Sequence, residues 1–257
     1  MKPQTKKICL WTAPVIIFVI FILILGYCYF TGKILNYTNE YNPTTRKLIK
    51  KTHFQPDRKT IKYINEYNPS NGNKIKETYF DPFTRKRIKE TRFQDNGKKI
   101  SNIIEFDPST GNLIKSTYFR SDGKTIFCIL EFNPSTGNLI ESIEFNSDGK
   151  TINVINEYDQ STGNKIQLIN FCSDGKTIDC INKFEPSTET KIKVTQLRSD
   201  GKKIKYIDEY DPSNGNKIKE TIFQPHDQTI DYINKYDSYT GNLIETTYYN
   251  PDGSIRE

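Results

Sequence analysis

Residues 208–233 read DEYDPSNGNKIKETIFQPHDQTIDYI, and this 26-residue pattern recurs from residue 39 to the C-terminus. A fixed period of this length indicates a repeat architecture, in which each unit packs mainly against its neighbours. An aromatic residue before the first turn anchors each unit, and all but one of the intervals between anchors equal the full period. The anchors are Tyr41, Tyr67, Phe80, Phe106, Phe132, Tyr158, Phe184, Tyr210 and Tyr236.

Each unit consists of two similar halves, and each half combines a turn with a short apolar segment. The first turn is typified by residues 211–216, DPSNGN, and the second by residues 147–150, SDGK. Pro, Gly, Asp, Asn and Ser favour turns, whereas the intervening segments rich in Ile, Thr, Tyr and Phe favour strands. Because apolar residues fall on both faces of these strands, we expect an all-β fold: an elongated antiparallel β-repeat, either a meander or solenoid-like.

The exceptional interval, from Tyr67 to Phe80, is half a unit long. Residues 67–79 form a first half that is followed directly by another first half. A chain that accommodates half a unit uses one strand and one turn as its structural step. This irregularity favours a meander over a solenoid whose coil needs both halves.

The N-terminal segment differs in character from the repeats. Residues 8–30 carry no charge, and 23 helical residues reach roughly 34 Å, enough to cross a hydrocarbon core of about 30 Å. Lysines precede this segment, so the positive-inside rule predicts a cytoplasmic N-terminus and extracellular repeats in a single-pass membrane protein. We therefore expect a cytoplasmic N-terminus at 1–7, a transmembrane helix acting as signal anchor at 8–30, a linker at 31–38 and repeats at 39–257.

The competing interpretation of residues 8–30 is a cleaved signal peptide. Its apolar region normally spans 7–15 residues and ends at a small-x-small site, and neither feature is present here. The length of the segment therefore favours an uncleaved anchor.

Charge excludes nucleic acid as a partner. The chain carries a net charge of +6, but Lys2, Lys6, Lys7 and Lys33 contribute four of these charges, which leaves about +2 on the repeats. A nucleic-acid-binding domain would show a basic stripe. A protein partner of unknown identity fits the repeats better.

Catalytic residues are not evident. The two histidines, His53 and His226, are interpreted as variants of the second turn, and no nucleophile or orienting group accompanies them. The sequence has no P-loop, no dinucleotide fingerprint and no Cys/His metal spacing, so we expect no enzyme, no cofactor and no metal. Asp-rich turns could supply oxygen ligands to Ca²⁺, but ordinary turn chemistry explains them better. Outside the apolar segment, the odd number of cysteines (Cys128, Cys172 and Cys180) indicates that disulfides do not hold the fold.

Recognition is expected where the repeats vary. The aromatic anchors are interpreted as stacking on one another along the core, with a ligand-facing aromatic ladder as the alternative. One equivalent position changes from unit to unit while its neighbours stay fixed, and we interpret it as a variable recognition surface. Its residues are Tyr118, Glu144, Asn170, Gln196, Ile222 and Tyr248.

The unit EYDPxTGNxIKETxFxxDGKTIxYIN resembles the phytoplasma tandem-repeat proteins classed as a domain of unknown function. The resemblance covers residues 39–257, with local departures at Thr45-Arg46, Thr84-Arg85 and Glu189-Thr190. The repeats are more distantly similar to Tyr-Asp and MORN-type bacterial β-repeats. The resemblance implies a wall-less bacterium that lives inside hosts, with repeats that face the host, and it supplies no active site.

Taken together, these features predict a membrane-anchored protein that exposes a non-catalytic interaction or adhesion surface outside the cell. Two alternatives remain: a secreted host-directed effector released by signal cleavage, and an immunity protein of the MORN type.

Overall fold

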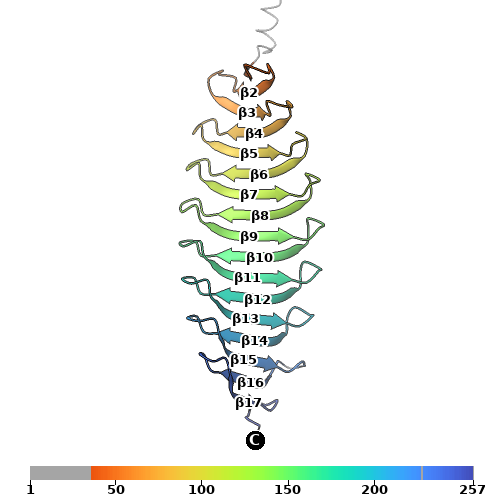
Figure 1. Cartoon of the computed structure of the whole chain (residues 1–257), viewed down its shortest axis with the longest axis vertical. Coiled ribbons are helices and arrows are strands. Elements are labelled where there is room, and N and C mark those ends of the chain that lie inside the picture. Colours follow the sequence, from red (N-terminus) through yellow and green to blue (C-terminus); the bar gives the residue numbers. More distant parts are fainter. Residues whose placement is uncertain (1–35, 227, 257) are drawn as a thin grey trace, which may run out of the picture.

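The computed structural model describes residues 36–226 and 228–256, which form one antiparallel sheet of 17 strands. Each strand pairs with its neighbours in sequence, so the strands stack like rungs with turns along two edges (Figure 1). The strands are β1 Tyr37–Tyr41, β2 Leu48–Phe54, β3 Ile61–Tyr67, β4 Lys74–Phe80, β5 Arg87–Phe93, β6 Ile100–Phe106, β7 Leu113–Phe119, β8 Ile126–Phe132, β9 Leu139–Phe145, β10 Ile152–Tyr158, β11 Lys165–Phe171, β12 Ile178–Phe184, β13 Lys191–Leu197, β14 Ile204–Tyr210, β15 Lys217–Phe223, β16 Ile230–Tyr236 and β17 Leu243–Tyr248.

The structural step is half of the repeat unit, because from β2 onward every strand begins half a unit after the one before it. The all-β antiparallel fold expected from the sequence is confirmed, and of the two arrangements left open the sheet is a meander. The half unit at residues 67–79 contributes one additional strand and turn without breaking the sheet. The sheet begins at Tyr37, so it takes in the last two residues of the segment expected as a linker.

The transmembrane helix expected at residues 8–30 lies outside the described residues. Within residues 36–226 and 228–256, no helix has the length and apolar character needed to span a membrane.

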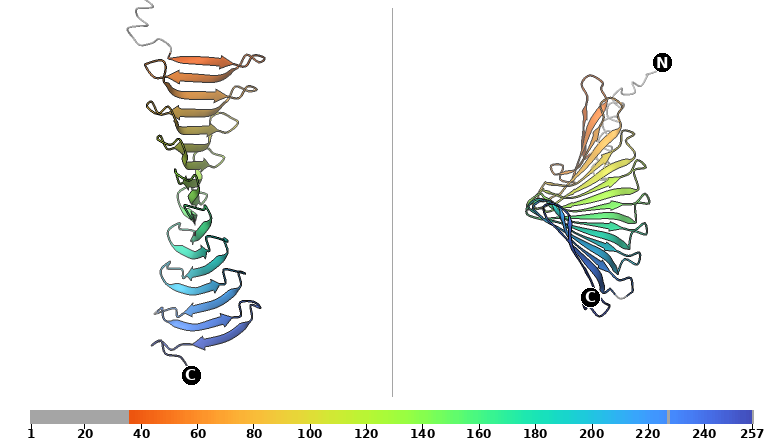
Figure 2. Two further views of the ribbon diagram at one scale, coloured as in Figure 1. Left: turned by 90° about the vertical axis from the view of Figure 1, so that its left-hand side faces the viewer. Right: turned by 60° about the horizontal axis from the view of Figure 1, so that its bottom comes forward.

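A β-bulge accompanies each strand pairing and bends the sheet. In the β10–β11 pair, Glu157 lies opposite Gln167 but Tyr158 lies opposite Lys165, which leaves Ile166 as the additional residue. Bulges of this kind increase the right-handed twist between strands. The accumulated twist is visible in Figure 2, where strands that are broadside at both ends of the molecule are seen nearly end-on in its middle.

Two turn types alternate along the chain, and each uses an acidic or amide side chain to hold its backbone. In the SDGK type, the Asp148 carboxylate accepts hydrogen bonds from the Lys150 N–H at 2.9 Å and the Thr151 N–H at 3.0 Å. In the six-residue type, Asn133 accepts from the N–H groups of Ser135 and Thr136. Both types need a left-handed residue, which accounts for the repeated glycines.

Three six-residue turns place a non-glycine residue in this left-handed position. Arg46, Arg85 and Glu189 have φ values of 57°, 60° and 55°. These are the six-residue turns in which the sequence departs from the repeat by lacking the glycine. The departures therefore keep the turn conformation and strain one residue in each turn.

Successive turns on one edge are joined by asparagine side chains. The Nδ2 of Asn112 donates to the Pro134 carbonyl at 2.7 Å, one unit further along the chain. Asn164 makes the same 2.7 Å bond to Pro186, and Asn216 bonds Ser238 at 2.8 Å. These bonds explain why asparagine follows glycine in the well-kept turns.

The apolar core is thin, as the alternation of residue types indicated. Among the described residues, the buried apolar side chains are Phe106 and Val194, each 8% exposed. Every contact between strands joins consecutive strands. Stability therefore comes from the sum of neighbouring strand pairs rather than from a central core.

Candidate functional site

Side chains that lie directly opposite one another form continuous rows along the sheet. We name the two outer rows after their first and last residues. Row 37–245 consists of Tyr37, His53, Tyr63, Tyr79, Lys89, Glu105, Lys115, Glu131, Glu141, Glu157, Gln167, Lys183, Lys193, Glu209, Lys219, Lys235 and Glu245. Row 40–248 consists of Glu40, Lys50, Glu66, Lys76, Arg92, Asn102, Tyr118, Cys128, Glu144, Val154, Asn170, Cys180, Gln196, Tyr206, Ile222, Tyr232 and Tyr248.

The two rows lie on opposite faces of the sheet. Val154 and Glu157 belong to different rows, and residues an odd number of positions apart in a strand point to opposite faces. The two faces can therefore present different chemistry to a partner.

The half unit makes the two rows exchange character between β4 and β5. In β1–β4, row 37–245 is aromatic and row 40–248 is an alternation of Glu and Lys. From β5 onward, row 37–245 becomes the charged one. An inserted single strand produces this exchange, because it reverses which face each half of the following units presents.

The aromatic stretch of row 37–245 is a ladder of four rings. The His53 ring stacks on Tyr63 with centroids 4.1 Å apart, and further ring contacts join Tyr37 to His53 and Tyr63 to Tyr79. His53 therefore lies within β2 rather than in a turn, so that interpretation was wrong. Burial, followed by the charge of Lys51, lowers the pKa of the imidazole, which favours its neutral form. His226 lies in a turn, as expected.

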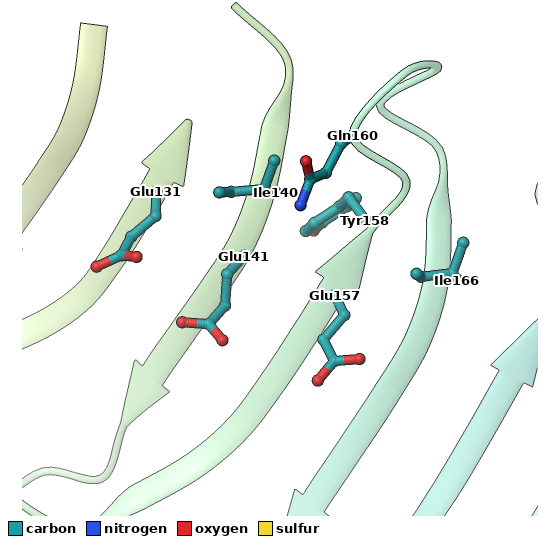
Figure 3. A pocket seen from close by; sticks show the side chains of 7 residues that line it. All are labelled: Glu131, Ile140, Glu141, Glu157, Tyr158, Gln160 and Ile166. Atoms are coloured by element: carbon teal, nitrogen blue, oxygen red, sulfur yellow. The ribbon is translucent and has the colours of Figure 1, made fainter. Parts of the chain in front are cut away.

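The charged stretch of row 37–245 contains three consecutive carboxylates. Glu131, Glu141 and Glu157 lie opposite one another on β8, β9 and β10 and line a shallow depression of about 310 Å³ (Figure 3). Burial raises the pKa of the Glu141 carboxyl, and the charges of Glu131 and Glu157 raise it further. Within the part of the chain that the structure describes, no group of three or more His, Cys, Asp or Glu side chains is arranged to hold a metal ion.

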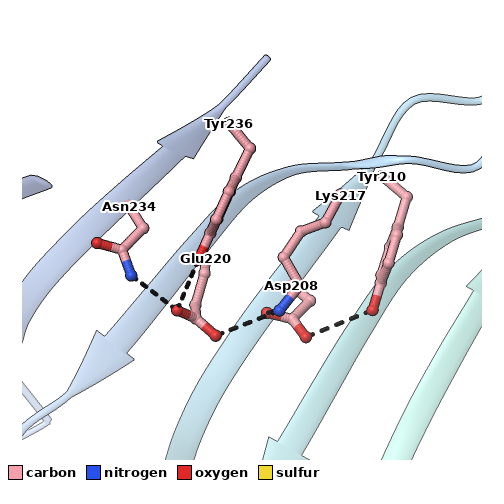
Figure 4. Close-up of polar contacts among 6 residues, drawn as sticks. All are labelled: Asp208, Tyr210, Lys217, Glu220, Asn234 and Tyr236. Carbon is pink, nitrogen blue, oxygen red and sulfur yellow. Dashed lines mark hydrogen bonds and ion pairs between the residues drawn. The ribbon is translucent and has the colours of Figure 1, made fainter. Parts of the chain in front are cut away.

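A polar network occupies the other face near the C-terminal end. The Lys217 ammonium lies 2.9 Å from Asp208 and 3.2 Å from Glu220, and it joins two neighbouring strands (Figure 4). The Tyr236 hydroxyl and the Asn234 amide donate to Glu220 at 3.2 and 2.8 Å. Burial lowers the pKa of Lys217, but the hydrogen bonds and charges of the two carboxylates outweigh it and raise this pKa.

The aromatic anchors are the last residues of their strands, and cations lie over several of them. Lys165 Nζ is 6.0 Å from the ring centroids of both Tyr158 and Phe184, and Lys191 lies 4.7 Å from that of Tyr210. Among the described residues, no two anchors make a ring–ring contact, so the expected stacking of anchor on anchor was wrong. Cation–π contacts replace it, because the residue that opens a neighbouring strand is often Lys or Arg.

The six positions expected to vary as a recognition surface all belong to row 40–248 and share one face. Tyr118 is 37% exposed and Tyr248 is 49% exposed, while Glu144, Asn170, Gln196 and Ile222 are half-buried. Their role in recognition stays a prediction. Sequence reasoning did not identify their partners in the row, such as Tyr206 and Tyr232, because strand register was needed to place them.

The three cysteines of the sheet are free thiols. Cys128 and Cys180 belong to row 40–248, whereas Cys172 begins a turn segment on the edge. The Cys180 sulfur accepts hydrogen bonds from the amides of Asn170 and Asn182. Burial, followed by the charge of Glu144, raises the pKa of the Cys128 thiol, which makes it less reactive.

Several solved structures show distant similarity to this chain. TarM matches at 11% identity and a TM-score of 0.31, with 55% of this chain and 23% of TarM covered. A complex of S. aureus TarM matches at 14% identity and a TM-score of 0.33, with 50% of this chain and 23% of that chain covered. A porin-like protein from Bacteroides uniformis matches at 10% identity and a TM-score of 0.23, covering 86% of this chain and 92% of that one. These values are too low to support an inference about activity. This chain thus spans less than a quarter of the TarM chains it matches.

A search of curated proteins finds no match. A family model matches residues 30–79, 80–106, 93–144, 145–196, 197–248 and 227–256, which takes in the whole sheet. The chain therefore belongs to the family described as "Protein of unknown function (DUF2963)".

Proposed function

We propose that this chain holds an extended, non-catalytic interaction surface outside a cell membrane, anchored by one apolar span at residues 8–30. The observation that carries the proposal is the single-layer sheet, whose two faces are both open to solvent across the described residues. A sheet with so few buried apolar side chains lacks the core of a compact globule. It instead leaves a large fraction of its side chains accessible to a partner.

The variation along row 40–248 supports a role in recognition. Between β7 and β17 this row contains aromatic, aliphatic, amide, thiol and carboxylate side chains. On the opposite face, by contrast, the row of directly opposed residues from Thr91 to Thr247 consists of isoleucine and threonine alone. A surface that differs from strand to strand can contact a partner at several points along its length.

The host-facing role rests on the resemblance to phytoplasma repeat proteins and on the lysines that precede residue 8. Uncleaved, the apolar segment would keep the sheet at the cell surface. Cleaved, it would release the same sheet as a secreted effector.

Protease treatment of intact cells tests the proposal. We expect the sheet to be removed and a small membrane-held stub to remain, while a cytoplasmic marker stays intact. Full protection of the sheet would contradict an extracellular location and favour a cytosolic immunity protein. Full-length sheet in the medium, with no stub in the membrane, would favour the secreted effector.

A binding measurement tests the surface itself. Tyr118→Ser and Tyr248→Ser remove two exposed rings of row 40–248 and should weaken capture of a partner by the protein. Tyr239→Ser is the matched control, because Tyr239 is 87% exposed and lies in a turn outside both rows. Equal binding by all three variants would show that row 40–248 does not carry recognition.

A further inference from the structure

The charges of row 37–245 are arranged antisymmetrically about the boundary between β10 and β11. Strands at equal distances on the two sides of this boundary carry opposite charges over four successive pairs. These pairs are Glu141 with Lys183, Glu131 with Lys193, Lys115 with Glu209, and Glu105 with Lys219. The innermost pair, Glu157 and Gln167, joins a carboxylate to an amide.

This order leaves like charges in contact within one molecule. Glu141 lies directly opposite both Glu131 and Glu157, and Lys183 lies directly opposite Lys193. Among the ion pairs of residues 36–226 and 228–256, none involves Glu141, Lys183 or Lys193. Like charges directly opposite destabilise a sheet, so an isolated chain gains nothing from this arrangement.

The same face carries a row of isoleucines beside these charges. Ile129, Ile143, Ile155, Ile169 and Ile181 lie opposite one another in succession. Each is two residues from a member of row 37–245 and therefore points to the same side. All five are half-buried, and within residues 36–226 and 228–256 their strands contact only the neighbouring strands of the sheet.

We propose that this face binds the same face of a second copy of the chain. The two-fold axis would lie parallel to the strands, between β10 and β11. This rotation reverses the order of the strands and places row 37–245 of one copy on row 37–245 of the other. Glu141 of each copy then meets Lys183 of its partner, and Glu131 meets Lys193, while the isoleucine rows pack against each other.

The twist of the sheet confines the contact to the strands near the axis, because a twisted face turns steadily away from its partner. The six strands β8–β13 span roughly 29 Å at about 4.8 Å per strand, and seven residues span roughly 23 Å. Such a patch buries about 1,300 Å² over both copies, which lies within the range of stable interfaces. All four charges of the Glu141–Lys183 and Glu131–Lys193 pairs lie on these strands.

The inference rests on the proposal that the sheet is an interaction surface, but its test is separate. Sedimentation reports self-association wherever the sheet is located in the cell. Protease exposure reports location whether or not two copies associate.

Two charge reversals test the pairing in the full-length chain, studied in a mild detergent. Lys183→Glu places a carboxylate against Glu141 of the partner, and Glu141→Lys places an ammonium against Lys183. For each variant alone, the dimer dissociation constant should rise about tenfold or more, measured by sedimentation velocity over a concentration series. Each also removes like-charge repulsion within its own sheet, so neither should melt at a lower temperature than the wild type when all three are compared at a dilution at which they are monomeric.

Mixing the two variants provides the decisive arm. The mixed dimer restores opposite charge at both symmetry-related contacts, because one copy carries lysine at both positions and the other carries glutamate at both. Differently tagged variants should therefore capture each other with nearly wild-type affinity. Lys235→Glu is the matched control: Lys235 also lies in row 37–245 opposite a lysine, Lys219, but outside β8–β13, so its reversal should leave association unchanged.

A monomeric wild type would overturn the proposal. So would charge-reversal variants that associate like the wild type, as expected if residues 8–30 held the copies together. A mixture that fails to regain affinity would equally rule out the β10–β11 axis.

Discussion

Tyr79 lies directly opposite Lys89 across the β4–β5 pair, at the point where the aromatic stretch of row 37–245 meets its charged stretch. On the other face, Lys76 lies opposite Arg92, where the Glu/Lys alternation of row 40–248 ends. One strand therefore changes the chemistry of both faces at once. Each face has an N-terminal part and a longer C-terminal part of different character.

The first prediction concerns deletions. Removing residues 131–156 takes out two strands, joins Leu130 to Glu157 and restores a 26-residue interval between Phe106 and Tyr158. This variant should fold, because contacts are confined to consecutive strands. It should keep an all-β circular dichroism spectrum and show a modestly lower free energy of unfolding in urea. The variant that lacks residues 133–145 should also fold, but each later strand should present its opposite face.

A shorter deletion from the same place, residues 131–150, provides the control. Its length is not a multiple of the half-unit step, so it should break strand register and destabilise the sheet far more. Equal damage from the deletions of 131–156 and 131–150 would contradict the nearest-neighbour description of the sheet.

The second prediction concerns the carboxylate cluster. The raised pKa of Glu141 means that its stability contribution is fully present below the ordinary glutamate pKa and is lost as the pH rises through the folded-state pKa. Glu141→Gln removes the repulsion from both neighbours, so it should raise the free energy of unfolding at neutral pH by roughly 0.5 kcal/mol at low salt. Urea unfolding of dilute protein checks this.

Glu144→Gln is the matched control for that measurement, because Glu144 belongs to row 40–248 and faces Cys128 and Val154 rather than other carboxylates. Glu144→Gln should not raise the free energy of unfolding by a comparable amount. A gain of the same size in both variants would show that net charge, and not the cluster, sets the effect.

The third prediction concerns acid. Hydrogen bonds from the Thr125 hydroxyl and from the Lys124 and Thr125 N–H groups lower the pKa of Asp122 to about 2. Because the folded-state pKa is depressed, the contribution is present above the ordinary aspartate pKa and is lost as the pH falls toward 2. Unfolding measured between pH 5 and about 2 should show this loss. Asp122→Asn should reduce the dependence of the free energy of unfolding on pH over this range, whereas an unchanged pH dependence would rule out Asp122 as a contributor.

The fourth prediction concerns a glycine that serves two purposes. Gly149 has a φ of 66°, and a Cβ placed there would lie 2.5 Å from Thr125 Cγ2 and 2.9 Å from the Ile126 backbone nitrogen. Gly149→Ala should therefore cost more than the roughly 1–2 kcal/mol of left-handed strain alone. Gly137 has a φ of 78° with nothing within 4 Å, so Gly137→Ala isolates the strain. Urea unfolding of the two variants should separate the two costs.

The period of the sequence predicted the strands, the turns and the half-unit step. Turn residues and β-formers alternate so regularly that each strand could be located between two successive turns, and the left-handed conformation of Gly123, Gly149 and Gly175 followed from the turn sequence. Local chemistry decides these features, and local chemistry is visible in a single sequence.

The arrangement of the faces could not be predicted in the same way. Each bulge adds a residue, such as Ile166, that the simple alternation of strand residues does not reveal. Without the register, the anchors were expected to stack on one another, whereas Lys165 lies over the rings of both Tyr158 and Phe184. His53 was assigned to a turn for the same reason, since its place in β2 opposite Tyr63 depends on pairing.

The half-unit step gives this architecture a parity. Adding two strands lengthens the molecule by about 10 Å and, apart from the rotation that the twist adds, leaves the distal strands presenting the same faces. Adding one strand lengthens it by half as much and inverts everything beyond the insertion, as the strand contributed by residues 67–79 has done here. The number of strands therefore sets both the length of the sheet and its orientation. A larger number places the last strands farther from the first, and whether the number is odd or even decides which face the last strands present.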